Sequence, residues 1–173
     1  MPASFYDLSA ASYLQTLRAT AAVLETGRSH LTEHGPAPDE LARFRLHDDM
    51  APLCFQLVSV WHHSLGALSG MQAGVFAPPP QVDDTSYAGL EKLVAEAIDG
   101  VAAWREDDVN GLSGRPMLFR IGDREIPFTT DNFLTSFSLP NFYFHATTTY
   151  VVLRMHGVPL GKRDFLGQLR ITV

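Results

Sequence analysis

The chain has 173 residues and a net charge of −6 at neutral pH, and 46 % of its residues are hydrophobic against 18 % charged. This length supports one hydrophobic core and predicts a single domain over residues 1–173. The acidic balance, with no basic stretch to neutralise phosphates, argues against nucleic acid as a partner.

The cysteine and hydropathy patterns bear on the cellular compartment. Cys54 is the only cysteine, which excludes an internal disulfide or a thiolate zinc cluster and favours a reducing compartment. The first residues lack the basic and apolar segments of a secretion signal, and no uncharged apolar run reaches membrane-spanning length. We therefore expect a cytoplasmic protein with no membrane partner.

Four segments carry hydrophobic residues at the three, four and seven-residue spacing that is typical of amphipathic helices. They are predicted to be helical over about residues 5–31, 48–72, 85–104 and 140–156. Asp48 and Asp49 would favour the beginning of the second helix, and Thr85 or Ser86 would cap the third. Gly157 follows the fourth helix and would end it.

The segments between the helices predict little further regular structure. MLFRI and REIPF flank Gly122 and Asp123, which predicts a two-stranded hairpin around a tight turn. We expect VFAPPPQVDD to be an extended linker, and the tail GKRDFLGQLRITV to cross the helices as coil or a short strand. The predicted fold is an all-α four-helix bundle with a small β-hairpin inserted between helices three and four.

Asn141 and His145 lie four residues apart at the beginning of the predicted fourth helix, and therefore on one face. They could form a buried pair with satisfied hydrogen bonds, line a small-molecule pocket, or be part of a metal site. In a pocket, His145 could act as a general acid or base, because the ordinary histidine pKa is about 6.5. The sequence shows no Ser-His-Asp triad and no phosphate-binding glycine loop.

Two other histidine motifs lie on or near the predicted second helix. The side chains of His62 and His63 diverge by about 100° around a helix, so at most one is expected to face the core. In the run His47, Asp48, Asp49 the acidic residues are expected to cap the helix.

Three motifs in order suggest a family. LHDDMAPLCFQ, the hairpin, and NFYFHATTTYVVLRMHGVPLGKRDFLG resemble the DUF1993 family, which lies within the DinB/YfiT-like superfamily of four-helix bundles. The resemblance covers nearly the whole chain, from FYDLSAASYLQTL to DFLG. It implies a DinB-like bundle, and a homodimer as relatives often form. Superfamily members often bind a divalent metal through one histidine on the second helix and two in an H-x-x-x-H-R-G-Q motif followed by L-R-x-x-G.

The resemblance can be carried over residue by residue. Aligned on LRMHG, His145 takes the place of the second histidine of the pair and Asn141 that of the first, while Gln56 takes the place of the histidine on the second helix. Carboxamide oxygens are weak ligands for zinc, nickel or iron(II). The resemblance therefore implies a ligand-binding trio of Gln56, Asn141 and His145 with no confident metal.

A metal site would need replacement ligands. The candidates near the second helix are His47, Asp48, Asp49, His62 and His63. His63 lies seven residues after Gln56, about two turns or about 10 Å along the helix, and is expected to be too far away to replace it directly. The fallback metal set is His47, His63 and His145.

Three functions remain open at this point. The first is a small-molecule site without metal at Gln56, Asn141 and His145, with His145 as the catalytic residue if the site is catalytic. The second is a divalent-metal-dependent transferase or hydrolase of the DinB/YfiT-like type. The third is a structural or interaction protein in which the polar trio sets the helix register.

Overall fold

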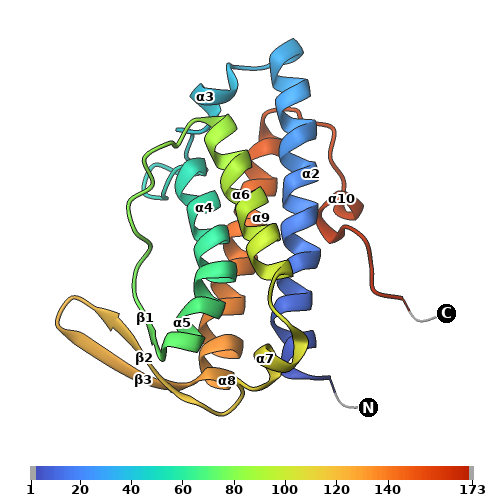
Figure 1. The fold of residues 1–173 in the computed structure, drawn as a ribbon. Coiled ribbons are helices and arrows are strands. Elements are labelled where there is room, and N and C mark those ends of the chain that lie inside the picture. The colour runs from blue at the N-terminus through green and yellow to red at the C-terminus, as the bar shows by residue number, and fades with distance from the viewer. Residues whose placement is uncertain (1–2, 172–173) are drawn as a thin grey trace.

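The computed structural model describes residues 3–171 and shows a predominantly helical protein with a small three-stranded sheet (Figure 1). The longer helices are α2 (Ala10–His34), α4 (Leu53–Trp61), α6 (Tyr87–Ala102) and α9 (Leu139–Met155). The shorter ones are α1 (Phe5–Leu8), α3 (Pro38–Leu41), α5 (Ala67–Ala73), α7 (Glu106–Asn110), α8 (Thr130–Phe133) and α10 (Lys162–Leu166). Two π-helical segments are η1 (His62–Gly66) and η2 (Leu134–Ser138).

The predicted first helix is divided in two near its beginning. Ser4 caps α1, because its hydroxyl accepts a hydrogen bond from the backbone N–H of Asp7 and its own N–H donates to the Asp7 carboxylate. At Ser9 the backbone leaves helical geometry, with φ −105° and ψ −89°, and α2 begins at the next residue. The HGPAP segment ends α2 at His34, as the sequence predicts.

The second predicted helix begins later than expected. Its N-cap is Pro52, with extended backbone angles, and the first helical residue is Leu53. Asp48 and Asp49 lie in an exposed loop before it, where Nδ1 of His47 lies 2.7 Å from a carboxylate oxygen of Asp49. The predicted capping role of the acidic pair is therefore wrong, because the loop continues as far as Pro52. A proline suits this position because an N-cap residue does not use its backbone N–H in the helix, and proline has none.

Both π-helical segments interrupt longer helical runs. The first, η1, joins α4 to α5, and the second, η2, joins α8 to α9. A π-helical turn holds one residue more than an α-helical turn and is often found at functional sites. Hydrophobic periodicity does not show such an extra residue, and the sequence therefore predicted one unbroken helix across η1. The segment η2 lies before the predicted beginning of the fourth helix at about residue 140.

The hairpin is confirmed, but the sheet has a further strand. Strands β2 (Pro116–Ile121) and β3 (Arg124–Thr129) pair antiparallel across Gly122, whose φ of +57° suits the tight turn. Strand β1 (Val75–Phe76) pairs in parallel with β2. It lies in the segment that was expected to be a linker, and two residues are too few to show strand periodicity.

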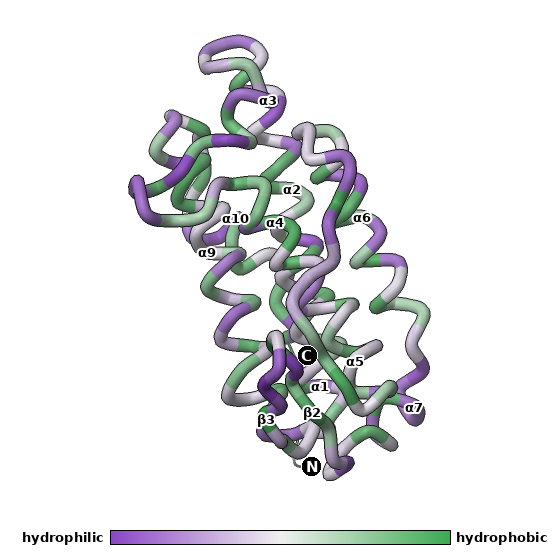
Figure 2. The backbone as a smooth tube through the Cα atoms, turned by 90° about the vertical axis from the view of Figure 1, so that its left-hand side faces the viewer, coloured by the Kyte–Doolittle hydropathy of each residue, from purple (hydrophilic) through white to green (hydrophobic). Residues whose placement is uncertain are grey.

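The long helices α2, α4, α6 and α9 run side by side, with α5 continuing α4 toward the sheet (Figure 1). Hydrophobic and hydrophilic positions alternate along α6 and α9 (Figure 2), as expected for helices with one buried face. Ser86 caps α6 as predicted, accepting a hydrogen bond from Gly89 N–H. Within residues 3–171, no helix is both long and apolar enough to cross a membrane.

The C-terminal tail begins with a short helix instead of the expected coil or strand, and residues 167–171 are coil as expected. Helix α10 packs against α2, and the side-chain amide of Gln15 donates a 3.0 Å hydrogen bond to the carbonyl oxygen of Leu166. The carboxylate of Asp164 accepts a hydrogen bond from Gly161 N–H and so closes the first turn.

Candidate functional site

A partly buried hydrogen bond joins α4 to α9 through two of the residues predicted to share a site. Gln56 is only 2 % exposed, and its Oε1 lies 2.7 Å from Nδ1 of His145. The side-chain nitrogen of Gln56 lies 2.8 Å from the backbone carbonyl oxygen of Ala51. The structure thus brings Gln56 and His145 together.

This chain of contacts determines the tautomer of His145. The carbonyl of Ala51 can only accept, so the Gln56 nitrogen must donate to it and the Gln56 oxygen must face the imidazole. Nδ1 of His145 therefore carries the proton and donates it to Gln56. Nε2 keeps its lone pair, and no residue in 3–171 forms a hydrogen bond with it.

His145 is half-buried between two aromatic side chains. Phe55 from α4 and the neighbouring Phe144 each meet its ring edge to face, with ring centroids 6.0 Å and 5.2 Å away. Burial lowers the pKa of His145 to about 4, because the imidazolium would lose hydration without gaining a counter-charge. The ring is therefore neutral at pH 7, with its lone pair available.

Asn141 lies one turn before His145 on α9 but does not join the pair. Its side-chain nitrogen donates a 2.7 Å hydrogen bond to the carbonyl oxygen of Phe137, on the preceding turn. This bond fixes the amide and leaves its oxygen as a free acceptor on the same helix face as His145. Asn141 and His145 therefore place two hydrogen-bond acceptors along one half-buried stripe of α9.

His63 lies beside His145, with which it was grouped in the fallback metal set, although it was expected to lie too far along the helix to replace Gln56 directly. The two imidazole rings are nearly parallel, 17° apart, with centroids separated by 6.0 Å. His63 is 7 % exposed, and its Nδ1 is buried without a hydrogen-bond partner. Burial, together with the nearby His62 and His145, lowers the pKa of His63 to about 3.

The expectation that at most one of His62 and His63 is buried is wrong. Both are 7 % exposed, because different elements cover the adjacent faces of η1. His62 stacks on Phe76 of β1 and its Nε2 lies 2.7 Å from the carbonyl oxygen of Ala77, whereas His63 faces α9. A Cβ at Gly66 would lie 2.8 Å from Nδ1 of His62, so this glycine four residues later is the sequence signal for a buried His62.

The residues present do not fit the three-histidine metal site that the superfamily resemblance implies. The oxygen of Gln56 is already occupied by the N–H of His145. His47 of the fallback set pairs with Asp49 in an exposed loop and is not brought together with His63 and His145. Within residues 3–171, no three or more histidine, cysteine, aspartate or glutamate side chains are grouped so that they could hold a metal ion.

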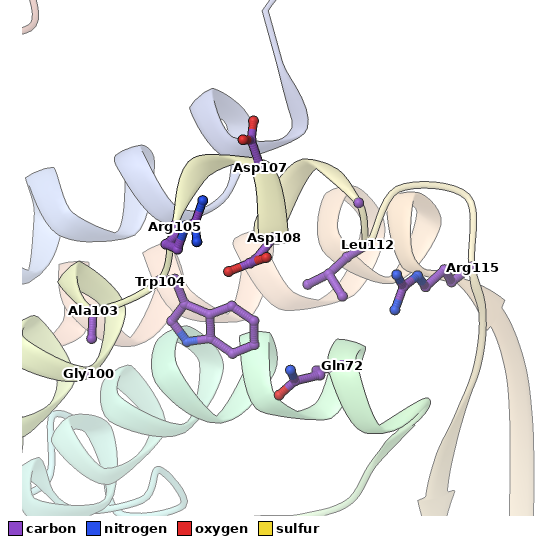
Figure 3. Close-up of a pocket in the computed structure, with 10 residues that line it drawn as sticks. Gln72, Gly100, Ala103, Trp104, Arg105, Asp107, Asp108, Leu112 and Arg115 are labelled. Carbon is purple, nitrogen blue, oxygen red and sulfur yellow. The ribbon is translucent and has the colours of Figure 1, made fainter.

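A separate cavity of about 510 Å³ lies between the C-terminal ends of α5 and α6 and helix α7 (Figure 3). The indole of Trp104 lies between Gln72 and Asp108, with Arg115 on the far side of Leu112 (Figure 3). Its charged side chains are exposed and of both signs, so water and salt screen their pull on a ligand. None of the residues singled out in the sequence lines it.

Comparison with known proteins shows the fold and the family. The crystal structure of a DinB family member protein from Shewanella denitrificans matches with a TM-score of 0.80 and 22 % sequence identity, covering 97 % of this chain and 94 % of that one. No curated protein matches the sequence. The model of a family described as a domain of unknown function, DUF1993, matches residues 5–166, and the chain therefore belongs to the DUF1993 family.

Proposed function

We propose that this protein binds a small molecule, without a metal, through Nε2 of His145. The observation that carries the proposal is the hydrogen-bond chain from Ala51 through Gln56 to His145. The bond to Gln56 fixes the tautomer of His145 and leaves the acceptor Nε2 of this half-buried ring without a partner among residues 3–171. Gln56 acts as the positioning residue, in the way that an outer-shell acceptor orients a functional histidine.

The low pKa of His145 favours binding over proton abstraction. A group with a pKa of about 4 is always unprotonated at pH 7, but the conjugate acid it would form is too strong for efficient general base catalysis. As a neutral acceptor the same nitrogen binds an O–H or N–H group of a ligand. The oxygen of Asn141, one turn away, would accept a second hydrogen bond from a ligand with two donors.

The wider setting of the proposal is a DinB-like four-helix bundle built from α2, α4, α6 and α9, which the match to the DinB family member supports. A cytoplasmic location and a homodimer stay predictions from the sequence. Divalent-metal chemistry of the superfamily type is the alternative that the test below must distinguish.

The test follows the ring nitrogens of His145 by long-range ¹H–¹⁵N NMR during a fragment screen. We expect hits that donate a hydrogen bond to move the Nε2 resonance while the Nδ1 resonance keeps its protonated position. The same hits should lose at least about tenfold in affinity in His145→Ala, with His47→Ala as the exposed-histidine control.

Two results would contradict the proposal. Hits whose affinity is equal in wild type and His145→Ala would show that His145 does not bind them. One divalent ion per chain, lost in His145→Ala, would establish the metal-dependent alternative instead.

A further inference from the structure

A second cavity, of about 460 Å³, lies next to the His145 site on the outer side of α4. It is open to solvent and lies between α4 and residues 77–86, which we call the strap. The lining is largely apolar and holds no charged side chain: Pro52, Cys54, Phe55, Val58, Pro79, Pro80, Gln81, Val82 and Thr85. This volume is in the range of ligand pockets, which are predominantly apolar with few polar groups.

The strap is held by a hydrogen bond at each end. Near β1, the carbonyl of Ala77 is held by the buried ring of His62 at 2.7 Å. At the other end, the N–H of Tyr87 donates a 2.8 Å hydrogen bond to the carboxylate of Asp39. Between these anchors, Pro78, Pro79 and Pro80 keep the chain extended, without backbone N–H groups for regular structure. Figure 1 shows the strap running along α4 from the sheet to the beginning of α6.

Phe55 connects this cavity to His145. Its side chain lines the cavity, is 42 % exposed, and meets the ring of His145 edge to face at 6.0 Å. Gln56, the next residue on α4, makes the hydrogen bond that orients His145. The ring of Phe55 therefore borders both the apolar cavity and the imidazole of His145.

We propose that the cavity takes the apolar part of the same ligand whose hydrogen-bond donor binds His145, so that the ligand is a small amphipathic molecule with an aryl or alkyl body and one neutral polar head. This inference rests on the proposed function. A neutral head is favoured because the cavity supplies no counter-charge, and Asp83 and Asp84 of the strap would repel an anion.

The test uses the series phenylethanol, phenylpropanol and phenylbutanol, with the methyl ether of each as a matched probe that lacks the O–H. Two readouts are followed on the same samples. Alkylation of Cys54 by iodoacetamide, measured by mass spectrometry, reports occupation of the cavity that it lines. The Nε2 resonance reports the hydrogen bond to His145.

We expect the alcohols to slow the alkylation of Cys54, with Kd falling about fourfold for each added methylene group. Each methyl ether should bind about fivefold more weakly than its alcohol, which corresponds to one neutral hydrogen bond. In His145→Ala the alcohol and the ether should protect Cys54 equally.

A matched pair of substitutions tests whether the alcohols bind in the cavity beside the strap. Gln81 is exposed on the strap and lines the cavity, so Gln81→Trp should fill it and weaken the alcohols at least about tenfold. Gln72 is also exposed but lines the cavity beside Trp104, so Gln72→Trp should leave the affinities unchanged.

The outcomes separate the two proposals. Alcohols that shift the His145 resonance but leave the alkylation of Cys54 unchanged, or bind Gln81→Trp normally, would overturn this inference and leave the proposed function standing. Alcohols and ethers that protect Cys54 equally in the wild type would overturn both the proposed function and the amphipathic ligand class.

Discussion

The hydroxyl of Ser138 in η2 donates a 2.8 Å hydrogen bond to the backbone carbonyl oxygen of His63 in η1, and so joins the two π-helical segments. Because this bond uses the only proton of Ser138, the hydroxyl of Tyr13, 2.8 Å away, must donate to the Ser138 oxygen. Tyr13 and Ser138 are fully buried. The chain from α2 through η2 to η1 thus fixes the backbone that carries His63 beside His145.

Replacing Ser138 should destabilise the protein more than an ordinary serine substitution. Ser138→Ala removes the side-chain hydrogen bond to the carbonyl of His63 and leaves the hydroxyl of Tyr13 buried without a partner, which should lower the free energy of unfolding by about 1–3 kcal/mol. Tyr13→Phe should cost about 1 kcal/mol, because the hydroxyl of Ser138 keeps its own acceptor. Urea unfolding of both variants measures these changes.

The double variant provides the sharper result. Ser138→Ala leaves the hydroxyl of Tyr13 without a partner, and Tyr13→Phe removes that hydroxyl. The double variant should therefore lose less free energy of unfolding than the sum of the two single variants. Ser69→Ala, at an exposed serine whose hydroxyl donates to the carbonyl of Leu65 one turn earlier in η1, is the control and should change stability by less than about 0.5 kcal/mol. Additive losses would contradict the proposed hydrogen-bond chain.

Stability should fall as the pH is lowered from about 6.5 toward 4. Burial lowers the pKa of His62, brings that of His63 to about 3 and that of His145 to about 4. In this window the unfolded chain binds protons on these histidines and the folded chain does not, so protonation favours unfolding as the pH decreases. Urea midpoints measured at pH 7 and pH 5 should therefore differ, with the lower midpoint at pH 5.

Substitution of one histidine shows how much of this pH dependence of stability comes from that residue. In His63→Gln the midpoint should change less between pH 7 and pH 5 than in the wild type, whatever the stability at pH 7. Equal slopes in the wild type and His63→Gln would mean that His63 titrates normally in the folded protein.

A carboxylate in place of Gln56 should raise the pKa of His145. In Gln56→Glu the side chain still accepts the N–H of Nδ1, but it now carries a negative charge that stabilises the imidazolium, so the pKa should move from about 4 back toward the ordinary histidine value. Titration of the ring by NMR measures it. Gln72→Glu, on exposed α5 surface, is the matched control. An unchanged pKa, or a wild-type proton on Nε2, would refute the assigned tautomer.

Histidines at the positions that the resemblance implies should raise the zinc affinity of the protein above that of the natural sequence. In Gln56→His/Asn141→His the positions implied by the resemblance carry three imidazoles, and the Gln56 oxygen no longer ties up His145. Calorimetry with Zn²⁺ should show affinity at least about tenfold above that of the wild type, and each single variant should lie between the two. Wild-type binding as tight as that of the double variant would show that amides already complete a metal site.

The sequence was informative where a pattern extends over several turns or residues. The hydrophobic spacing of the long helices, the cap at Ser86 and the turn at Gly122 could all be predicted, because each depends on local chemistry. The beginning of α4 could not, because acidic residues favour both a helix start and an exposed loop. Strand β1 also escaped prediction, since its parallel pairing depends on residues some forty positions later, as in Val75 with Leu118.

The candidate site was half predictable for a similar reason. Gln56 and His145 follow from the alignment with the superfamily motifs and from helix geometry. The place of His63 does not, because it depends on the π-helical turn and on packing against α9. Nor could the sequence show that Asn141 bonds back to its own helix, as an amide has many competing local partners.

The two π-helical segments also limit which length changes the chain can absorb. Deleting one residue from η1 would restore an α-helical turn and rotate α5 by about 100° relative to α4, turning Leu68 and Met71 out of the core. The same deletion in η2 would rotate α8 relative to α9. The extra residue in each π-helical segment therefore sets the rotation of one helical part relative to the next. A substitution that keeps the chain length cannot reproduce the effect of that residue.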